Sequence, residues 1–286
     1  MHLSPETDRA GPSDLRLAPE LEDAGYRLIS LPVTGSTNED ALRAARDGDP
    51  GPLWIVAAEQ QAGRGRHGRS WTSPPGNLYA SLLLIDPCEP RFAPQLGFVT
   101  GLALHQAIEG LAGTGAPRLA LKWPNDLLLD GAKLAGILLE GHRIDGRFAV
   151  VVGCGVNVAS APEGTPYRTA SLQDLRPGLT REALFPAFAA AFARCFSAWQ
   201  EAHRSGHPDP FAATRRLWLA RAAGIGTEVT LRLPSGERRG RFAGLDPAGR
   251  LELDTGRGLE LIDAGDLYFP APHPRTAELP AGTTGS

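Results

Sequence analysis

The only two lysines of the chain, Lys122 and Lys133, are the residues whose type and spacing point most directly to chemistry. Both lie in the segment KWPNDLLLDGAK, whereas the rest of the 29 basic residues are arginine. An ammonium is a compact point charge with a titratable proton, and a guanidinium is a rigid planar fork. We therefore predict chemistry on an anionic substrate at this segment. The alternative is that the arginine bias reflects a GC-rich genome and that two lysines remain by chance.

The segment QQAGRGRHGRSW, residues 60–71, is the second candidate. Glycine gives the backbone freedom, and arginine offers paired donors to carboxylate or phosphate oxygens. We predict a loop that is mobile when empty and closes over an anion, with Arg64 and Arg66 on one side of an extended chain. Arginine–glycine segments also occur in nucleic-acid binders and solvated linkers, but those are usually longer and lack a flanking apolar strand. No Gly-Lys-Ser or Gly-Lys-Thr follows, so a nucleotide would be held differently from the way a Walker A loop holds it.

The motif GSTNE, residues 35–39, carries small hydrogen-bonding side chains. Ser36 followed by Glu39 fits a capping box at the start of a helix. The same groups at a helix N-terminus could bind the polar head of a ligand. The two interpretations are compatible.

Two further motifs end apolar runs. In KWPND we expect Asp126 within reach of an amine or a metal ion, the alternative being a turn-forming Asn-Asp pair. In GCGVNV, residues 153–158, the alternative to a site is a glycine-rich end of a buried strand, with Asn157 as a turn residue.

Apolar periodicity predicts the elements that position these motifs. Helical spacing occurs over 96–111 and 184–199. Pro186 implies that the second helix is kinked or begins later than Thr180 suggests. Runs of strand length occupy 54–59, 78–85, 119–123 and 148–158. This order predicts an α+β fold with a mixed sheet and flanking helices.

A hairpin is predicted over residues 126–140, because Asp130-Gly131 between apolar runs is typical of a two-residue type I′ turn. Lys133 would follow the turn. Strand alternation places it on one face with Ala135 and Ile137, and places Gly136 on the other.

The length of 286 residues fits one large domain and one small one. From residue 223 onward, short apolar runs alternate with PSG, DPAG, TGRG and DAGD, which predicts a small antiparallel barrel over 223–270. The predicted large domain is 28–222. Residues 1–27 and 271–286 are predicted to be disordered tails.

Composition narrows the class of protein. A net charge of -3 argues against a dedicated nucleic-acid binder. Three dispersed cysteines provide neither a disulfide framework nor metal spacing. The sequence shows no signal peptide and no apolar stretch of roughly 18 residues. We therefore expect a cytoplasmic protein without a membrane partner.

The motifs GSTN, QQAGRGRHGRSW, KWPNDLLLDGAKLAGILLE and GCGVNV, followed by a small barrel, resemble the biotin-protein ligases over residues 28–269. These are also called biotin-[acetyl-CoA-carboxylase] ligases. The resemblance implies a catalytic core of the class II synthetase type and a C-terminal SH3-like barrel. It also implies an enzyme that joins biotin to ATP, with Mg²⁺, to give biotinyl-5′-adenylate and pyrophosphate. Biotin then passes to one lysine of a biotin carboxyl carrier protein domain.

The resemblance also assigns residues, with no metal site among them. Biotin is expected to contact Ser36, Thr37, Asn38, Gln60, Arg64, Gly65, Arg66, Lys133 and Gly136. The nucleotide is expected to contact Arg66, Arg69, Trp71, Asn125, Lys133 and Asn157. The catalytic groups are expected to be Arg64, Arg66, Asp126 and Lys133. In this scheme the positive groups offset the repulsion between a carboxylate and a triphosphate, and the loop excludes water from a hydrolysis-prone intermediate.

Two departures from the family pattern matter. His67 stands where the motif often has a further arginine, which weakens the charge of the loop when histidine is neutral. Many bacterial relatives carry an N-terminal helix-turn-helix, but only about 27 residues precede the core here, too few for a folded domain of typical size. We therefore expect a ligase without DNA binding or repressor function, either a monomer or a homodimer.

Two other functions are alternatives. A lipoate- or octanoate-protein ligase or transferase shares the architecture, but such enzymes lack the GRGRxGRxW loop and usually the spacing of the hairpin. A non-catalytic binding module or regulator would use the barrel as an interaction surface and would not exchange pyrophosphate into ATP.

Overall fold

The computed structural model describes residues 15–113 and 119–269. Its large sheet has the strand order β1-β2-β3-β7-β6-β5-β4. The strands are β1 Arg27–Thr34, β2 Leu53–Gln60, β3 Leu78–Ile85, β4 Leu119–Lys122, β5 Asp126–Leu129, β6 Ala132–Ile144 and β7 Arg147–Val156. Only β1 and β2 pair in parallel, and the other neighbours are antiparallel. The predicted mixed sheet is confirmed, although β1 was not foreseen.

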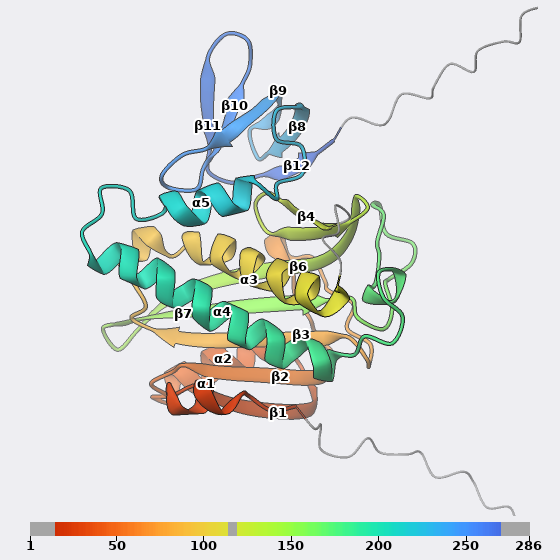
Figure 1. The fold of residues 1–286 in the computed structure, drawn as a ribbon, viewed down its shortest axis with the longest axis vertical. Helices are drawn as coiled ribbons and strands as arrows, with labels where there is room; N and C mark the ends of the chain where they lie inside the picture. The colour runs from red at the N-terminus through yellow and green to blue at the C-terminus, as the bar shows by residue number, and fades with distance from the viewer. Residues whose placement is uncertain (1–14, 114–118, 270–286) are drawn as a thin grey trace, which may run out of the picture.

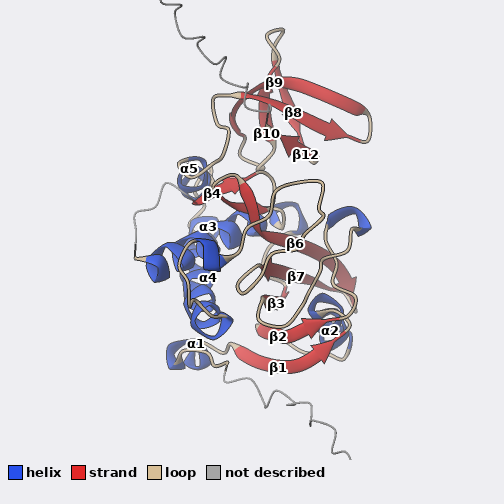
Figure 2. Cartoon of the chain, turned by 90° about the vertical axis from the view of Figure 1, so that its right-hand side faces the viewer, coloured by secondary structure: helices blue, strands red, loops and turns tan. Residues whose placement is uncertain are grey.

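Helices cover both faces of this sheet (Figure 1, Figure 2). They are α1 Pro19–Asp23, α2 Thr37–Arg46, α3 Gln95–Ala112, α4 Arg181–Arg204 and α5 Ala212–Leu219, with short 3₁₀ turns at Arg66–Gly68, Pro90–Phe92 and Leu172–Asp174. The paired helices α3 and α4 pack on one face and α2 on the other. Both predicted helices are confirmed.

The main core lies beneath α4. The Trp54 ring meets Phe185, Phe188 and Phe192 edge-on, with centroids 5.6–5.8 Å apart. Helix α4 begins directly after Thr180, whose side chain accepts a hydrogen bond from the Ala183 amide at 3.3 Å. The alternative of a later start, suggested by Pro186, is wrong.

Folded structure begins closer to the N-terminus than the sequence predicts. Leu15, Leu17 and Leu21 are buried in the main core, and α1 leads into β1 at Arg27. The expectation of a disordered tail up to residue 27 is therefore wrong from Leu15 onward, because its leucines pack on the core. Residues 1–14 and 271–286 lie outside the described residues, so the rest of the tail prediction is untested.

The small domain is a five-stranded antiparallel sheet in the order β11-β10-β9-β8-β12. Its strands are β8 Glu228–Leu233, β9 Gly236–Leu245, β10 Leu251–Asp254, β11 Leu259–Ile262 and β12 Asp266–Tyr268. All lie within the predicted range 223–270. The sheet sits beyond β4 (Figure 1), where the Trp123 indole donates to the Gly249 carbonyl at 3.3 Å. This contact joins the turn between β9 and β10 to the residue that follows β4.

Within the described part of the chain, none of the helices is long and apolar enough to cross a membrane.

Candidate active site

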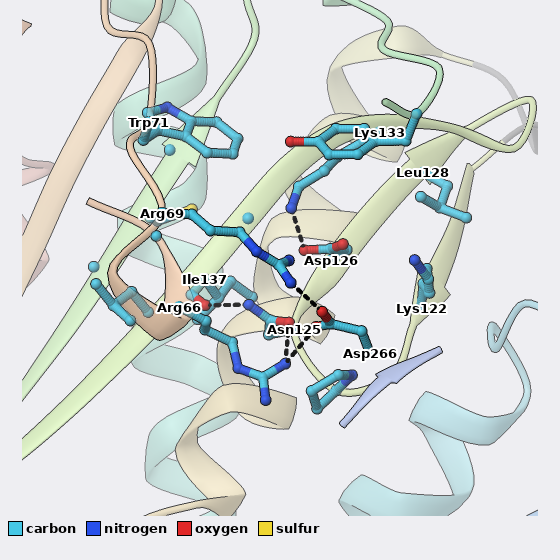
Figure 3. A pocket seen from close by; sticks show the side chains of 18 of the residues that line it. Arg66, Arg69, Trp71, Lys122, Asn125, Asp126, Leu128, Lys133, Ile137 and Asp266 are labelled. Atoms are coloured by element: carbon cyan, nitrogen blue, oxygen red, sulfur yellow. Dashed lines mark hydrogen bonds and ion pairs between the residues drawn. The ribbon is translucent and has the colours of Figure 1, made fainter. Parts of the chain in front are cut away.

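A cavity of about 410 Å³ lies between the large sheet, the loop 63–71 and strand β12 (Figure 3). Its floor is a row of cross-strand partners: Lys122 pairs with Asp126, Asp126 with Gly136, and Gly136 with Gly155. Paired residues of neighbouring strands project to the same face of a sheet. The row therefore presents two charged side chains followed by two glycines.

The glycines of the floor make room for Trp71. A Cβ at Gly155 would lie 2.6 Å from the Trp71 indole, and one at Gly136 would lie 3.2 Å from it. The indole N–H is buried and has no hydrogen-bond partner among the described residues. The ring of Trp71 is thus held by packing on the two glycines.

Lys133 and Asp126 form the central ion pair, with 2.8 Å between Nζ and Oδ1. The Lys133 ammonium lies between the Trp71 and Tyr167 rings, 5.5 Å and 5.6 Å from their centroids. Both partners belong to the predicted hairpin, whose turn is confirmed by positive φ values of 48° at Asp130 and 75° at Gly131.

The predicted face of Lys133 is wrong. The pairing of β5 with β6 shifts register between Leu127, which pairs with Ala135, and Leu128, which pairs with Lys133. A β-bulge of this kind interrupts the alternation of side chains. As a result Lys133 lies on the same face as Gly136, where a Cβ would be 3.5 Å from its Nζ.

The arginine loop is folded back on itself. Arg64 and Ser70 form an antiparallel bridge, and the Gly65 amide donates to the Arg69 carbonyl at 2.7 Å. His67 and Gly68 have positive φ values at the tip. The extended conformation predicted for this loop is therefore wrong.

The loop arginines point to different partners, which corrects the prediction that Arg64 and Arg66 share one side. Arg64 Nη2 lies 2.6 Å from Glu39 and 3.6 Å from Glu140. Arg66 Nη1 instead donates to Asn125 Oδ1 at 3.2 Å and to the Gly265 carbonyl at 3.3 Å. Separate carboxylates and carbonyls draw the two guanidiniums apart.

Asp266 of β12 ties the loop to the small domain. Its carboxylate accepts a hydrogen bond from Arg69 and lies 3.9 Å from Arg66 (Figure 3). Burial alone would raise the pKa of Asp266, but the Arg69 hydrogen bond and the charges of Arg69 and Arg66 outweigh it and lower the pKa. Burial lowers the pKa of Arg66, opposed by Asp266 and Asp126. The small domain thus supplies part of the cavity wall.

The opposite end of the cavity presents the uncharged side chains of Thr37 and Gln60. Gln60 Oε1 accepts hydrogen bonds from the Thr37 amide at 2.9 Å and the Thr37 hydroxyl at 3.1 Å. Behind them Asn38 is buried, donates to Glu140 at 2.6 Å and occupies the space over Gly153. The charged groups behind this end, Glu39, Glu140 and Arg64, are paired with one another, so the end offers mainly hydrogen bonds from Thr37 and Gln60.

Ser36 precedes α2 with an extended backbone but makes no side-chain capping bond. The predicted capping box is therefore wrong, and Glu39 pairs with Arg64 instead. A nearby cation is a stronger partner for this carboxylate than the backbone amide.

Most of the predicted site residues meet in this cavity: it is lined by Thr37, Gln60, Arg64, Gly65, Arg66, Arg69, Trp71, Asn125, Asp126, Lys133 and Gly136. Ser36, Asn38 and Asn157 are buried just outside its lining. The Asn157 side chain donates to the carbonyls of Ala170 at 3.1 Å and Lys133 at 3.4 Å. It therefore supports the backbone of the hairpin from behind.

Comparison with known proteins decides the family. The model of the biotin/lipoate A/B protein ligase family matches residues 30–157, and that of the biotin protein ligase C-terminal domain matches 224–269. The biotin-[acetyl-CoA-carboxylase] ligase of Paracoccus denitrificans is 42% identical over 243 residues, covering 84% of this chain and 99% of that protein. The chain belongs to the biotin protein ligase family. The resemblance stated from the motifs is confirmed.

Two other biotin protein ligases are also similar to this chain, one in sequence and one in structure. The Mycobacterium tuberculosis biotin-[acetyl-CoA-carboxylase] ligase is 35% identical over 85% of this chain and 90% of its own length. The structure of the Aquifex aeolicus biotin protein ligase in complex with biotin and ATP matches with a TM-score of 0.69 and 29% identity, covering 85% of this chain and 97% of that chain. The fold class is thus confirmed for both the mixed-sheet core and the small C-terminal domain.

The site residues assigned from the sequence did not include several residues that line the cavity: Gly153, Gly155, Tyr167, Asp266 and Tyr268. The glycine pair in GCG was a usable signal, since alternate glycines on one strand leave room on one face. No sequence signal pointed to Asp266, because its role depends on where the small domain docks.

Proposed function

We propose that the protein activates biotin with ATP as biotinyl-5′-adenylate and then transfers it to a lysine of a biotin carboxyl carrier protein domain. One observation carries this function: the Lys133–Asp126 pair, the loop arginines and the uncharged side chains of Thr37 and Gln60 line the same cavity. Such a cavity suits a ligand with an uncharged head and an acidic tail that meets a polyanion.

Biotin would lie across the floor. Its ureido head would bind at Thr37 and Gln60, with Ser36 and Asn38 fixing the start of α2 behind them. Its carboxylate would reach the Lys133 ammonium beside Asp126 of β5, and β5 lies two strand spacings, or about 10 Å, from β7. Gly136 and Gly155 keep this path open.

The nucleotide would bind beside the loop, at Arg66, Arg69, Trp71 and Asn125. A carboxylate approaching a triphosphate is repelled, so fixed positive groups lower the barrier by stabilising charge in the transition state. Asn157 would act indirectly, through its contact with the Lys133 carbonyl.

Magnesium fits as part of the ATP substrate. The described residues contain no group of three or more His, Cys, Asp or Glu side chains that could hold a metal ion. The carboxylates lining the cavity, Asp126 and Asp266, are each paired with a cation. Mg²⁺ is commonly held by substrate phosphates with one or two carboxylates, which this arrangement allows.

Asp126 has a second role in the proposal. An acceptor lysine must lose a proton before its amine can attack the adenylate, and Asp126 lies at the reacting centre on the cavity floor. It would position or deprotonate that lysine. We propose that the reaction takes place in the cytoplasm, on a monomer or a homodimer.

Biotin-dependent exchange of pyrophosphate into ATP tests the function. We expect exchange with biotin and not with lipoate, followed by labelling of a carrier domain on one lysine. Exchange driven by lipoate, or by neither acid, would overturn the proposal.

Replacing Arg66 with glycine should speed the loss of the adenylate from the enzyme. Arg66 makes two hydrogen bonds that hold the loop to Asn125 and Gly265. Hydrogen bonds of a charged group contribute about 1.5–3 kcal/mol each, so we expect at least a tenfold shorter retention half-life. Release would be followed by filtration of enzyme loaded with radiolabelled biotinyl-adenylate.

Arg257→Gly is the matched control, because Arg257 is an exposed loop arginine outside the cavity. It should release the adenylate at the wild-type rate. An unchanged half-life for Arg66→Gly would show that Arg66 does not hold the loop closed.

A further inference from the structure

Lys122 lines the cavity, but the proposed function assigns no role to its ammonium. It ends β4, and its side chain lines the cavity at the far end of the floor, next to the small domain. Three strand spacings, roughly 14 Å, separate it from the glycines of β7. Biotin bound at Thr37 with its carboxylate at Lys133 would stop short of Lys122.

The charge environment of Lys122 differs from that of its neighbours. Four cavity cations have carboxylate partners: Arg64, Arg66, Arg69 and Lys133. Among residues 15–113 and 119–269, Lys122 has no ion-pair partner within 4.0 Å, and its ammonium lies 5.7 Å from the centroid of the Tyr268 ring. Arg168 also lacks an ion pair there, but its side chain is exposed to water.

Keeping this ammonium charged is costly in the empty cavity. Burial lowers the pKa of Lys122; the charges of Asp126 and Asp266 oppose that shift, and those of Lys133 and Arg69 add to it. A bound polyanion would compensate both burial and cationic repulsion. Beyond the reacting carboxylate, the cavity thus ends at a buried ammonium that has no ion pair with a described residue.

We propose that Lys122 binds the β- and γ-phosphates of ATP and stabilises the leaving pyrophosphate. This inference rests on the proposed function. The biotin carboxylate oxygen forms a bond to the α-phosphorus, and the bond from that phosphorus to the bridging oxygen breaks. The electron pair departs with pyrophosphate, whose charge the ammonium of Lys122 offsets without transferring a proton.

The two half-reactions separate this role from a structural one, because transfer from supplied biotinyl-5′-adenylate involves no pyrophosphate. Lys122→Gln should raise the KM for pyrophosphate, in ATP synthesis from biotinyl-adenylate, by roughly tenfold or more. Transfer from supplied adenylate to the carrier should stay within about twofold, and Lys122→Arg should recover most of the loss because the charge remains. An equal fall in both half-reactions, or an unchanged KM for pyrophosphate, overturns the inference.

Arg232→Gln is the matched control. Arg232 lies 4.6 Å from the centroid of the same Tyr268 ring but is outside the cavity lining. If Lys122 only supports Tyr268, the two variants should behave alike, which would also overturn the inference.

A second measurement needs no variant. The chain has two lysines, so an amine-acylating reagent followed by peptide mapping reports on Lys122 and Lys133 separately. Pyrophosphate with Mg²⁺ should slow labelling of Lys122 severalfold, and biotin alone should not. Labelling of Lys122 that pyrophosphate leaves unchanged counts against the site. If pyrophosphate protects Lys122 from labelling but the protein shows no biotin-dependent exchange of pyrophosphate into ATP, the proposed function is overturned. The anion site at Lys122 would still be supported.

Discussion

Replacing Lys133 with arginine should slow formation of biotinyl-adenylate by roughly a hundredfold or more, although the positive charge is retained. The ammonium fits a narrow position, 2.8 Å from Asp126 and between the rings of Trp71 and Tyr167. A planar guanidinium is wider and sets its donors in a fixed fork, so it cannot contact Asp126 and a substrate carboxylate in the same way. Single-turnover formation of the adenylate, measured with saturating biotin and ATP, gives the rate.

Arg143→Lys provides the control for this prediction. Arg143 lies on the same strand, is exposed and is outside the cavity, so exchanging its cation type should change nothing. Equal thermal midpoints of both variants would show that the fold is intact. Adenylation by Lys133→Arg at the wild-type rate would remove Lys133 from the reacting centre.

The sequence predicts the hairpin well because its determinants are local. Asp130-Gly131 specifies the turn, and the turn alone brings Asp126 and Lys133 onto neighbouring strands. The face of Lys133 was not predictable from alternation, since one register shift at Leu127 reverses it. Such a bulge depends on how β5 pairs with β6 and not on the apolar pattern of either strand alone.

Long-range partners account for the other failures. Glu39 was expected to cap α2, but Arg64 reaches it after the chain has crossed the sheet. Asp266 is separated from Arg69 by 197 residues, and its role exists only after the small domain has docked. Residue types therefore indicated the presence of an anion site, and tertiary pairing decided which arginine faces which acid.

Replacing Gly155 with alanine should lower adenylation by roughly a hundredfold through the position of the loop. The new Cβ would lie 2.6 Å from the Trp71 ring, a separation that requires the ring to move. No hydrogen bond from the indole N–H to a described residue resists this movement, and the Trp71 amide, bonded to the Gly63 carbonyl at 2.9 Å, transmits it to the loop. Arg66 and Arg69 would then shift relative to Lys133. Overpacking of this kind costs about 1–3 kcal/mol, which a domain of ordinary stability tolerates.

Urea unfolding and single-turnover adenylation distinguish the two effects of Gly155→Ala. Gly110→Ala is the control, because Gly110 lies on the exposed side of α3 and a Cβ added there would meet nothing within 4 Å. It should stabilise the protein by about 0.5–1 kcal/mol and leave adenylation unchanged. If Gly155→Ala loses stability but adenylates within a few-fold of wild type, the packing of Trp71 on the glycine floor does not set the position of the arginines. A large loss of adenylation with a small loss of stability would show that the bare backbone of β7 is kept for the loop.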